Sequence, residues 1–255
     1  MTRSVYRMLV VSVTLGLGPS TASASNKYLE VPPVELATAS PAYRYANLGD
    51  DEVLAELLAR GIPFARVEPA VPGVRLPIRL SGPLHGVAVH SALPEEKRKT
   101  SAFEILDARL ALALDDFCAL LAEREIVELV HFTIYRPGTY APASRSPSSS
   151  SPPALAPAGS TRHPGGLAVD VGALRKRSGE WLTVGQHWSS AIGAKTCGQG
   201  ARTLESEPGR ELQDIVCAAY EKRIFHYTLT PHFDKAHHDH LHLEIKPLVK
   251  WFLVN

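Results

Sequence analysis

The sequence has no marked excess of charge of either sign. It carries 27 Lys and Arg residues against 26 Asp and Glu residues, which gives a formal net charge of +1. A nucleic-acid-binding surface needs a basic field that neutralises phosphates, so we expect no nucleic-acid partner. Aromatic residues are also few, at 7%, whereas 45% of the 255 residues are hydrophobic. This composition is typical of a globular protein of one or two domains and argues against a disordered chain or a coiled coil.

Long hydrophobic runs are absent after the first 25 residues, which have the pattern of a secretory signal peptide. Two arginines accompany an apolar run over residues 8–17, and the small residues at 22–24 offer a cleavage site near Ala24. A bilayer span needs roughly 20 apolar residues, which this run does not reach. We therefore expect cleavage of residues 1–25, a secreted or periplasmic protein, and no transmembrane segment in the mature chain.

Cysteine is scarce, with three in the chain. A disulfide persists in an oxidising compartment, and we favour a bridge between Cys197, in a glycine-rich turn, and Cys217, on an expected helix. Cys118 would then be a buried thiol. Sequence alone does not choose among the single-bridge pairings, and three free thiols are a further alternative. The favoured bridge would stabilise the fold by roughly 3 kcal/mol through the loop that it closes.

Composition and hydrophobic periodicity divide the chain into segments. Residues 26–44 are rich in Pro, Ala and Ser and are expected to form a flexible tether, followed by one domain over residues 45–255. Residues 138–160 are rich in Ser and Pro and are expected to form a mobile loop in that domain; a linker between two domains is the alternative. Apolar spacings predict helices over 50–60, 103–126 and 210–222, short extended segments over 73–91, a hairpin-like stretch over 181–184, and strands over 127–135, 166–171, 223–230 and 239–246.

Two motifs carry residues with metal-binding chemistry. In TRHPGGLAVD, residues 161–170, His163 and Asp170 bracket glycines that let the backbone turn sharply. Downstream, His242 lies on an expected strand. Two imidazoles and one carboxylate, with a water in the fourth position, form the usual catalytic zinc site. We therefore expect His163, Asp170 and His242 to bind Zn²⁺, which lowers the pKa of bound water to about 7.

The second motif, HHDHLHLE over residues 237–244, surrounds the last expected ligand. Asp239 or His240 is expected to accept the proton of the metal-bound water, because both lie within three residues of His242. His237 is expected to lie in a loop and face the substrate. Glu244 is either a partner that orients an imidazole or a solvated strand residue. Alternation along the strand predicts an imidazole-rich face opposite a core face formed by Leu241, Leu243 and Ile245.

These motifs resemble those of known families. The pattern His-x6-Asp followed by His-x-His resembles the zinc peptidases of the D-Ala-D-Ala carboxypeptidase and murein endopeptidase superfamily, with Thr161 in place of a serine in their signature. More closely, TRHPGGLAVDV, GAKTCGQG and TPHFDKAHHDHLHLEI, with LDARLALALDDF and IYRPG upstream, resemble the bacterial extensin-like C-terminal domain family. The resemblance covers roughly residues 44–245.

The resemblance implies a fold and roles for individual residues. It implies a small α+β fold in which an antiparallel sheet with flanking helices carries His163, Asp170 and His242 as zinc ligands. It implies Asp239, three residues before the last ligand, as the general base. It also implies that Arg136, in the Tyr-Arg pair of IYRPG, binds a substrate carboxylate or carbonyl oxygen, which the planar guanidinium fork suits.

The functional hypothesis is a secreted zinc metallopeptidase-like protein that hydrolyses amide bonds of cell-wall peptidoglycan peptides. We expect it to act as a carboxypeptidase or an endopeptidase, and as a monomer. Two alternatives stay open. The chain could be a non-catalytic domain that binds cell-wall peptides, or a structural zinc domain in which His240 is the fourth ligand and no position remains for water.

Overall fold

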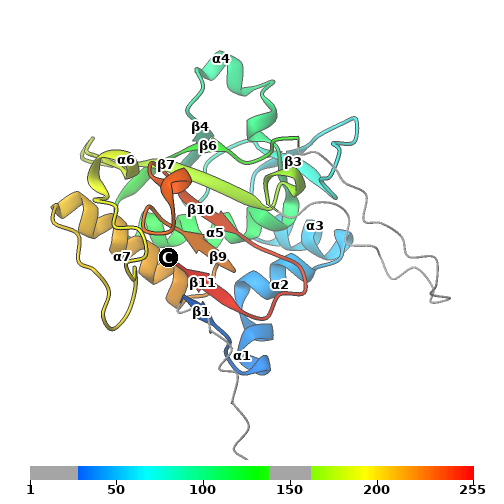
Figure 1. The fold of residues 1–255 in the computed structure, drawn as a ribbon. Helices are drawn as coiled ribbons and strands as arrows, with labels where there is room; N and C mark the ends of the chain where they lie inside the picture. Colours follow the sequence, from blue (N-terminus) through cyan, green and yellow to red (C-terminus); the bar gives the residue numbers. More distant parts are fainter. Residues whose placement is uncertain (1–27, 138–161) are drawn as a thin grey trace, which may run out of the picture.

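The central element of the fold is a mixed eight-stranded sheet. The computed structural model describes residues 28–137 and 162–255, and within them the strand order is β1-β11-β9-β10-β7-β6-β4, with β8 paired to β7 (Figure 1). Most pairs are antiparallel, but β4 and β6 are parallel, as are β9 and β11. The strands are β1 (Leu29–Glu30), β4 (Ala88–Ser91), β6 (Ile126–Thr133), β7 (Ala168–Lys176), β8 (Trp181–Thr183), β9 (Tyr227–Leu229), β10 (Leu241–Glu244) and β11 (Phe252–Val254).

Two long helices, α5 (Ala108–Ala122) and α7 (Glu207–Glu221), pack against each other and contribute to the hydrophobic core beside the sheet. In Figure 1, α5 runs behind the strands. The helix that the sequence predicts over residues 103–126 corresponds to α5. It begins at Ala108 because the Asp107 carboxylate accepts a hydrogen bond from the backbone N–H of Arg109 as an N-cap. Ser206 caps α7 in the same way. The chain therefore combines α and β structure as predicted, with parallel pairs in a sheet that was predicted to be antiparallel.

The residues expected to form a tether are instead structured from Leu29 onward. β1 pairs with β11, and α1 (Val34–Ala39) and α2 (Pro41–Asn47) follow, with α2 packed against α5. Two of the alanines that gave this segment its Pro-, Ala- and Ser-rich composition, Ala37 and Ala42, are buried in the core. Small side chains allow close packing of helices, a tertiary effect that composition alone does not reveal. The predictions for residues 1–25 and 138–160 concern positions outside the described ranges.

The remaining elements are short. A second sheet of three strands, in the order β2-β3-β5, lies beside the first, and α3 packs on α5. Among the described residues, no helix combines the length and the apolar character that crossing a bilayer requires. These elements are α3 (Asp50–Ala59), β2 (Phe64–Arg66), β3 (Pro77–Leu80), α4 (Glu95–Arg98), η1 (Ala102–Glu104), β5 (Leu106–Asp107), η2 (His163–Gly165), α6 (Val184–His187) and η3 (Lys235–His237).

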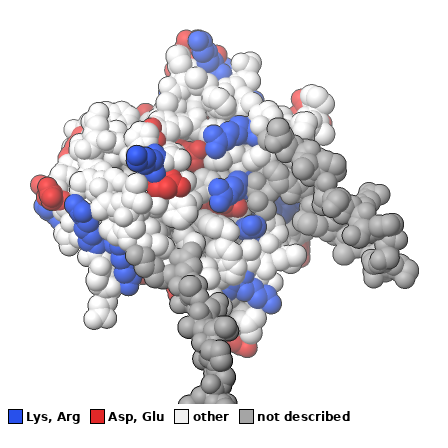
Figure 2. All heavy atoms as spheres, viewed as in Figure 1, with Lys and Arg blue, Asp and Glu red and all other residues white. Residues whose placement is uncertain are grey.

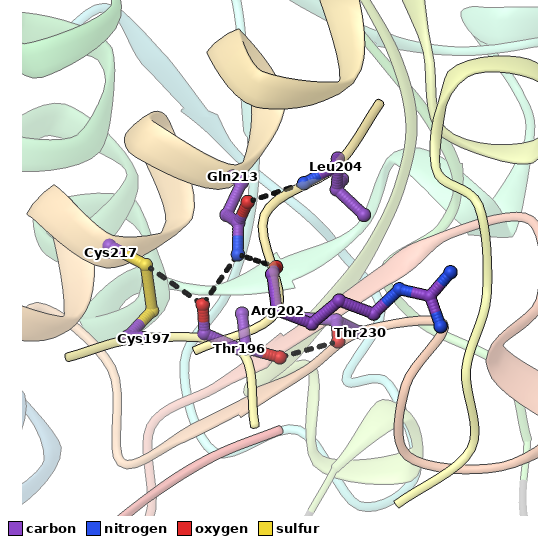
Figure 3. The surroundings of a disulfide bond; sticks show 7 residues. All are labelled: Thr196, Cys197, Arg202, Leu204, Gln213, Cys217 and Thr230. Carbon is purple, nitrogen blue, oxygen red and sulfur yellow. Dashed lines mark hydrogen bonds between the residues drawn. A yellow bond between two sulfur atoms is a disulfide. The ribbon is translucent and has the colours of Figure 1, made fainter. Parts of the chain in front are cut away.

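A disulfide joins Cys197 to Cys217, which confirms the predicted bridge, and Cys118 is a buried free thiol. The bridge attaches the glycine-rich turn to α7 across 20 residues of sequence. Gln213, one helical turn before Cys217, fastens the same segment: its side-chain amide donates to the carbonyls of Thr196, at 2.7 Å, and Arg202, at 2.8 Å (Figure 3). The turn is therefore fixed to α7 both covalently and by hydrogen bonds.

The alternation of side chains along β7 and β10 places the metal-binding motifs on one side of the sheet. Leu241 and Leu243 are buried in the core, as predicted, and so are Val169 and Val171 on β7. The residues between them point to the opposite side of the sheet. Because Asp170 pairs with His242 in the strand register, these two side chains lie next to each other on that side.

His226 joins the ends of β9, β10 and the final strand, and its ring must be neutral to do so. Its Nδ1 accepts the backbone N–H of Lys246, at 3.0 Å, and its Nε2 donates to the carbonyl of Val249, at 2.9 Å. Burial and the nearby Lys246 charge lower the pKa of His226 to about 4, although the Val249 hydrogen bond opposes the shift. Protonation is therefore easier in the unfolded chain than in the folded one.

We predict that His226 makes the fold sensitive to acid. Its pKa falls from 6.5 unfolded to about 4 folded, so its contribution is complete above pH 6.5 and is lost progressively as the pH falls towards 4. The loss should be on the order of 3 kcal/mol. The free energy of unfolding, measured with urea across this pH range, should have a shallower slope against pH for His226→Gln than for the parent chain. Exposed His238→Gln should keep the slope of the parent. Equal slopes in all three proteins would contradict the prediction.

Candidate metal centre

Three buried side chains from separate elements converge on the open side of the sheet. His163 is in η2, Asp170 on β7 and His242 on β10, and each is at most 4% exposed. Asp170 Oδ1 lies 3.1 Å from His163 Nε2 and 2.9 Å from His242 Nδ1. One potential ligand atom from each residue lies within 4.8 Å of the other two. The structure thus brings together the three residues that the sequence predicts as metal ligands.

The turn that delivers His163 depends on Gly166. This glycine has φ +65°, a left-handed conformation that side chains with a Cβ rarely adopt. A Cβ at this position would lie 2.7 Å from the backbone nitrogen of Asp107, which donates to the Gly166 carbonyl. The glycine therefore lets the chain reverse between η2 and β7 while it packs against the start of α5. His163 and Asp170 face each other as a result.

Hydrogen bonds behind the two histidines decide which ring nitrogens face the centre. His163 Nδ1 lies 2.8 Å from the Ile134 carbonyl, which only accepts, so this nitrogen carries the hydrogen and Nε2 faces Asp170. His242 Nε2 lies 3.3 Å from Glu244 Oε2, so this nitrogen donates to the carboxylate and Nδ1 faces Asp170. Such partners are typical of metal-ligating histidines, whose second nitrogen donates to a carboxylate or a backbone carbonyl.

The centre strongly favours a cation. Burial would raise the pKa of Asp170, but the imidazoles of His163 and His242 beside its Oδ1 hold that pKa below its usual value. Burial likewise opposes a rise in the pKa of His242, yet the carboxylates of Asp170 and Glu244 raise it. Both directions have the same cause, the attraction between the Asp170 carboxylate and the imidazole of His242 beside it. Two ligands at about 2.0–2.1 Å from a tetrahedral ion lie about 3.3 Å apart, close to the separations observed here. The residues present therefore fit a metal ion.

Glu244 is buried beside the candidate ligand His242 and is not a solvated strand residue. It is fully buried, and its second oxygen, Oε1, has no hydrogen-bond partner among the described residues. Arg162, next to His163 in the sequence, brings its Nε to 3.5 Å from Glu244 Oε2. Arg162 also has φ +70°, which is uncommon for a residue with a side chain. The sequence analysis did not identify Arg162, although its position beside His163 could have suggested it.

His240 lies beside the three converging residues and is partly exposed. Its Nδ1 is 2.9 Å from Asp239 Oδ1, and its Nε2 is 3.6 Å from Asp170 Oδ1. The carboxylate of Asp239 is 41% exposed and lies on the far side of the His240 ring from Asp170. Of these two predicted catalytic residues, His240 thus presents an atom directly to the centre, whereas Asp239 contacts it through His240.

His237 is also close to the centre, paired with a residue that the sequence analysis did not single out. Its Nδ1 lies 2.7 Å from Asp234 Oδ1, and its ring centroid is 5.1 Å from that of His240 and 5.9 Å from that of His242. Burial lowers the pKa of His237, and the Asp234 carboxylate opposes this shift. The spacing of three residues within FDKAH was the available signal for Asp234.

Arg136 is not brought into contact with the three converging side chains. Its side chain is exposed beyond the end of β6, and within the described ranges it forms no hydrogen bond or ion pair with them. It follows Ile134, whose carbonyl accepts from His163, by only two residues. Elsewhere on the face shown in Figure 2, basic and acidic side chains are scattered in small groups of both signs.

Comparison with known proteins supports part of the predicted resemblance. Residues 154–252 match the family described as Extensin-like protein C-terminus. This segment is less than half of the chain, and it contains His163, Asp170, His242 and the disulfide. No curated protein and no solved structure matches the chain. The match thus supports the extensin-like family for the segment that carries the candidate centre.

We predict that Glu244 strengthens metal binding through His242. In Glu244→Gln the shape of the side chain is kept, but the negative charge that accepts from His242 Nε2 is lost. The affinity for Zn²⁺, measured by competition with a chelating dye, should fall about 10- to 100-fold. Glu128→Gln is the matched control, because Glu128 pairs with His90 and Arg175 and not with the centre. Equal affinities of Glu244→Gln and the parent would contradict this role.

Proposed function

We propose that the chain is a secreted or periplasmic zinc metallopeptidase that hydrolyses amide bonds of peptidoglycan peptides. The observation that carries the proposal is the buried His163, Asp170 and His242 group, whose ring orientations are fixed by hydrogen bonds behind it. Zinc bound by these residues would act as a Lewis acid, which polarises a substrate carbonyl and lowers the pKa of water to about 7.

His240 is suited to accept the proton of the attacking water. Its Nδ1 donates to Asp239, which leaves the Nε2 lone pair directed towards the centre. An imidazole oriented by a carboxylate is the commonest general base in enzymes. In this assignment Asp239 orients His240 and stabilises the imidazolium ion that forms. The resemblance implied Asp239 as the general base, whereas this proposal assigns that role to His240.

Two further residues are suited to bind or protonate the substrate. His237 forms a second carboxylate–imidazole pair with Asp234, and its ring lies beside those of His240 and His242. It could donate a proton to the leaving amine or a hydrogen bond to the substrate. Arg136, exposed two residues beyond Ile134, is proposed to bind a substrate carboxylate or carbonyl oxygen through its guanidinium fork.

The distances favour an open metal site over the structural alternative. In a closed site His240 would be the fourth ligand, but although its Nε2 lies 3.6 Å from Asp170 Oδ1, it does not join the group of ligand atoms that all lie within 4.8 Å of one another. Within the described part of the chain, the group of mutually close ligand atoms contains only His163, Asp170 and His242. The Cys197–Cys217 disulfide supports an oxidising compartment, in agreement with the predicted export.

We predict that removal of the His240 imidazole abolishes most activity while the metal stays bound. The zinc-loaded chain should release peptides from isolated sacculi, and a chelator should stop the release. His240→Ala should reduce the rate about 10²- to 10⁴-fold, the usual contribution of a general base, with an unchanged zinc content. His238→Ala, which removes an exposed imidazole two residues away, should keep the parent rate.

Two results would count against the proposal. Sacculi that stay intact after long incubation with the zinc-loaded parent, together with retention of the protein on them, would favour the binding domain. Loss of zinc from His240→Ala would instead make His240 a ligand and favour the structural site.

A further inference from the structure

Within the described ranges, one side of the sheet carries partly exposed side chains over β6, β7 and β8, beyond the candidate metal centre. Side chains of residues paired across neighbouring strands point to the same side. Leu129 pairs with Leu174, which pairs with Leu182, and all three are fully buried in the core. The residues next to them along each strand therefore point away from the core. These residues, with Phe132, form what we call the open sheet face: Glu128, Val130, Phe132, Ala173, Arg175, Trp181 and Thr183.

An exposed aromatic ring marks the end of the open sheet face nearest the metal centre. Phe132 is 41% exposed, and its ring centroid lies 6.0 Å from that of His240. The ring lies against Gly172, where a Cβ would be only 2.6 Å from Phe132 Cε1 and Cζ. Gly172 thus leaves the space in which the ring sits on the strand, next to the proposed general base. An exposed large apolar side chain beside a candidate site indicates a binding surface more strongly than an isolated one on a surface loop does.

A second exposed aromatic ring marks the far end. Trp181 is 42% exposed, and the guanidinium carbon of Arg175 lies 5.7 Å from its ring centroid. Arg175 forms an ion pair with Glu128, whose other oxygen lies 2.9 Å from His90 Nε2. The positive and negative groups at this end therefore compensate each other. Gly172 and Arg175 are three residues apart on β7, or about 10 Å along the strand.

We infer that the open sheet face binds uncharged sugar units, so that a glycan chain runs from Trp181 towards Phe132 and the metal centre. Exposed aromatic rings offer flat apolar surfaces for the C–H face of a pyranose ring. The Arg175–Glu128 pair offers hydrogen-bond donors and acceptors without net charge, which suits hydroxyl and acetamido groups better than an ionic ligand. The span of about 10 Å between Gly172 and Arg175 along β7 is comparable to a linked pair of pyranose units.

The strand pairing argues against an extended peptide as the occupant of this face. Peptides that bind to sheets commonly add a strand to an open edge. Here β6 is paired on both sides, by β4 and β7, and β7 is paired by β6, β8 and β10. The central strands β6 and β7 therefore offer only side chains to a ligand, and within the described residues a peptide could add a strand to this part of the sheet only at the outer edges of β4 or β8. That the sugar belongs to the same molecule as the cleaved peptide rests on the proposed function.

The test is the binding of a soluble N-acetylglucosamine hexamer to the full chain, measured by calorimetry and by tryptophan fluorescence. Trp181→Ala and Phe132→Ala should each weaken binding about tenfold or more, which corresponds to about 1.4 kcal/mol. Leu58→Ala is the control, because Leu58 is exposed on α3, which packs on α5 and lies outside the open sheet face. Urea unfolding of each variant establishes that it is folded.

The outcomes separate this inference from the proposed peptidase. Failure of the hexamer to bind, or equal weakening by all three substitutions, would overturn the sugar site even if the parent chain cleaves sugar-free peptides. Binding that depends on Trp181 and Phe132 would support it even if no peptide is cleaved, in which case the peptidase proposal fails and the sugar site stands.

Discussion

The candidate centre depends on the hydrogen bonds that fix two imidazole rings around one carboxylate. The Ile134 carbonyl accepts a hydrogen bond from His163 Nδ1 and the Glu244 carboxylate accepts one from His242 Nε2, so the other nitrogen of each ring faces Asp170. Buried groups of this kind carry a large desolvation cost unless a cation compensates them. The same constraint explains why a fully buried glutamate lies next to a ligand, because its charge favours a cation bound through His242.

The fold supplies this geometry through strand register and one turn. Asp170 and His242 face each other because β7 and β10 pair antiparallel at these positions, and the left-handed Gly166 turns the chain so that His163 meets them. The opposite side of the same strands is packed in the hydrophobic core with α5 and α7. A buried core thus fixes the backbone from one side, while the other side stays available for chemistry. Rigid strands position side chains more accurately than loops do.

Much of the centre could be predicted from the sequence because it depends on short-range periodicity. A spacing of two residues along a strand places His240 and His242 on one side, and a glycine-rich turn brings His163 to Asp170. The helices at residues 34–47 were not predicted from composition, although alanine favours a helix, because the packing of α2 on α5 and of α1 on α2 that buries Ala37, Ala42 and Ala46 is a tertiary effect. The positions of Arg162 and Phe132 likewise follow from tertiary contacts, with Glu244 and with Gly172.

X-ray absorption at the zinc edge of the zinc-loaded chain and of His240→Ala distinguishes an open metal site from a closed one. We predict four light ligands at about 2.0 Å with two imidazoles, and the same spectrum in both proteins. A third imidazole that disappears in His240→Ala would show a closed site without room for catalysis. A folded chain that takes up no zinc at all would contradict the central claim that His163, Asp170 and His242 form a metal site.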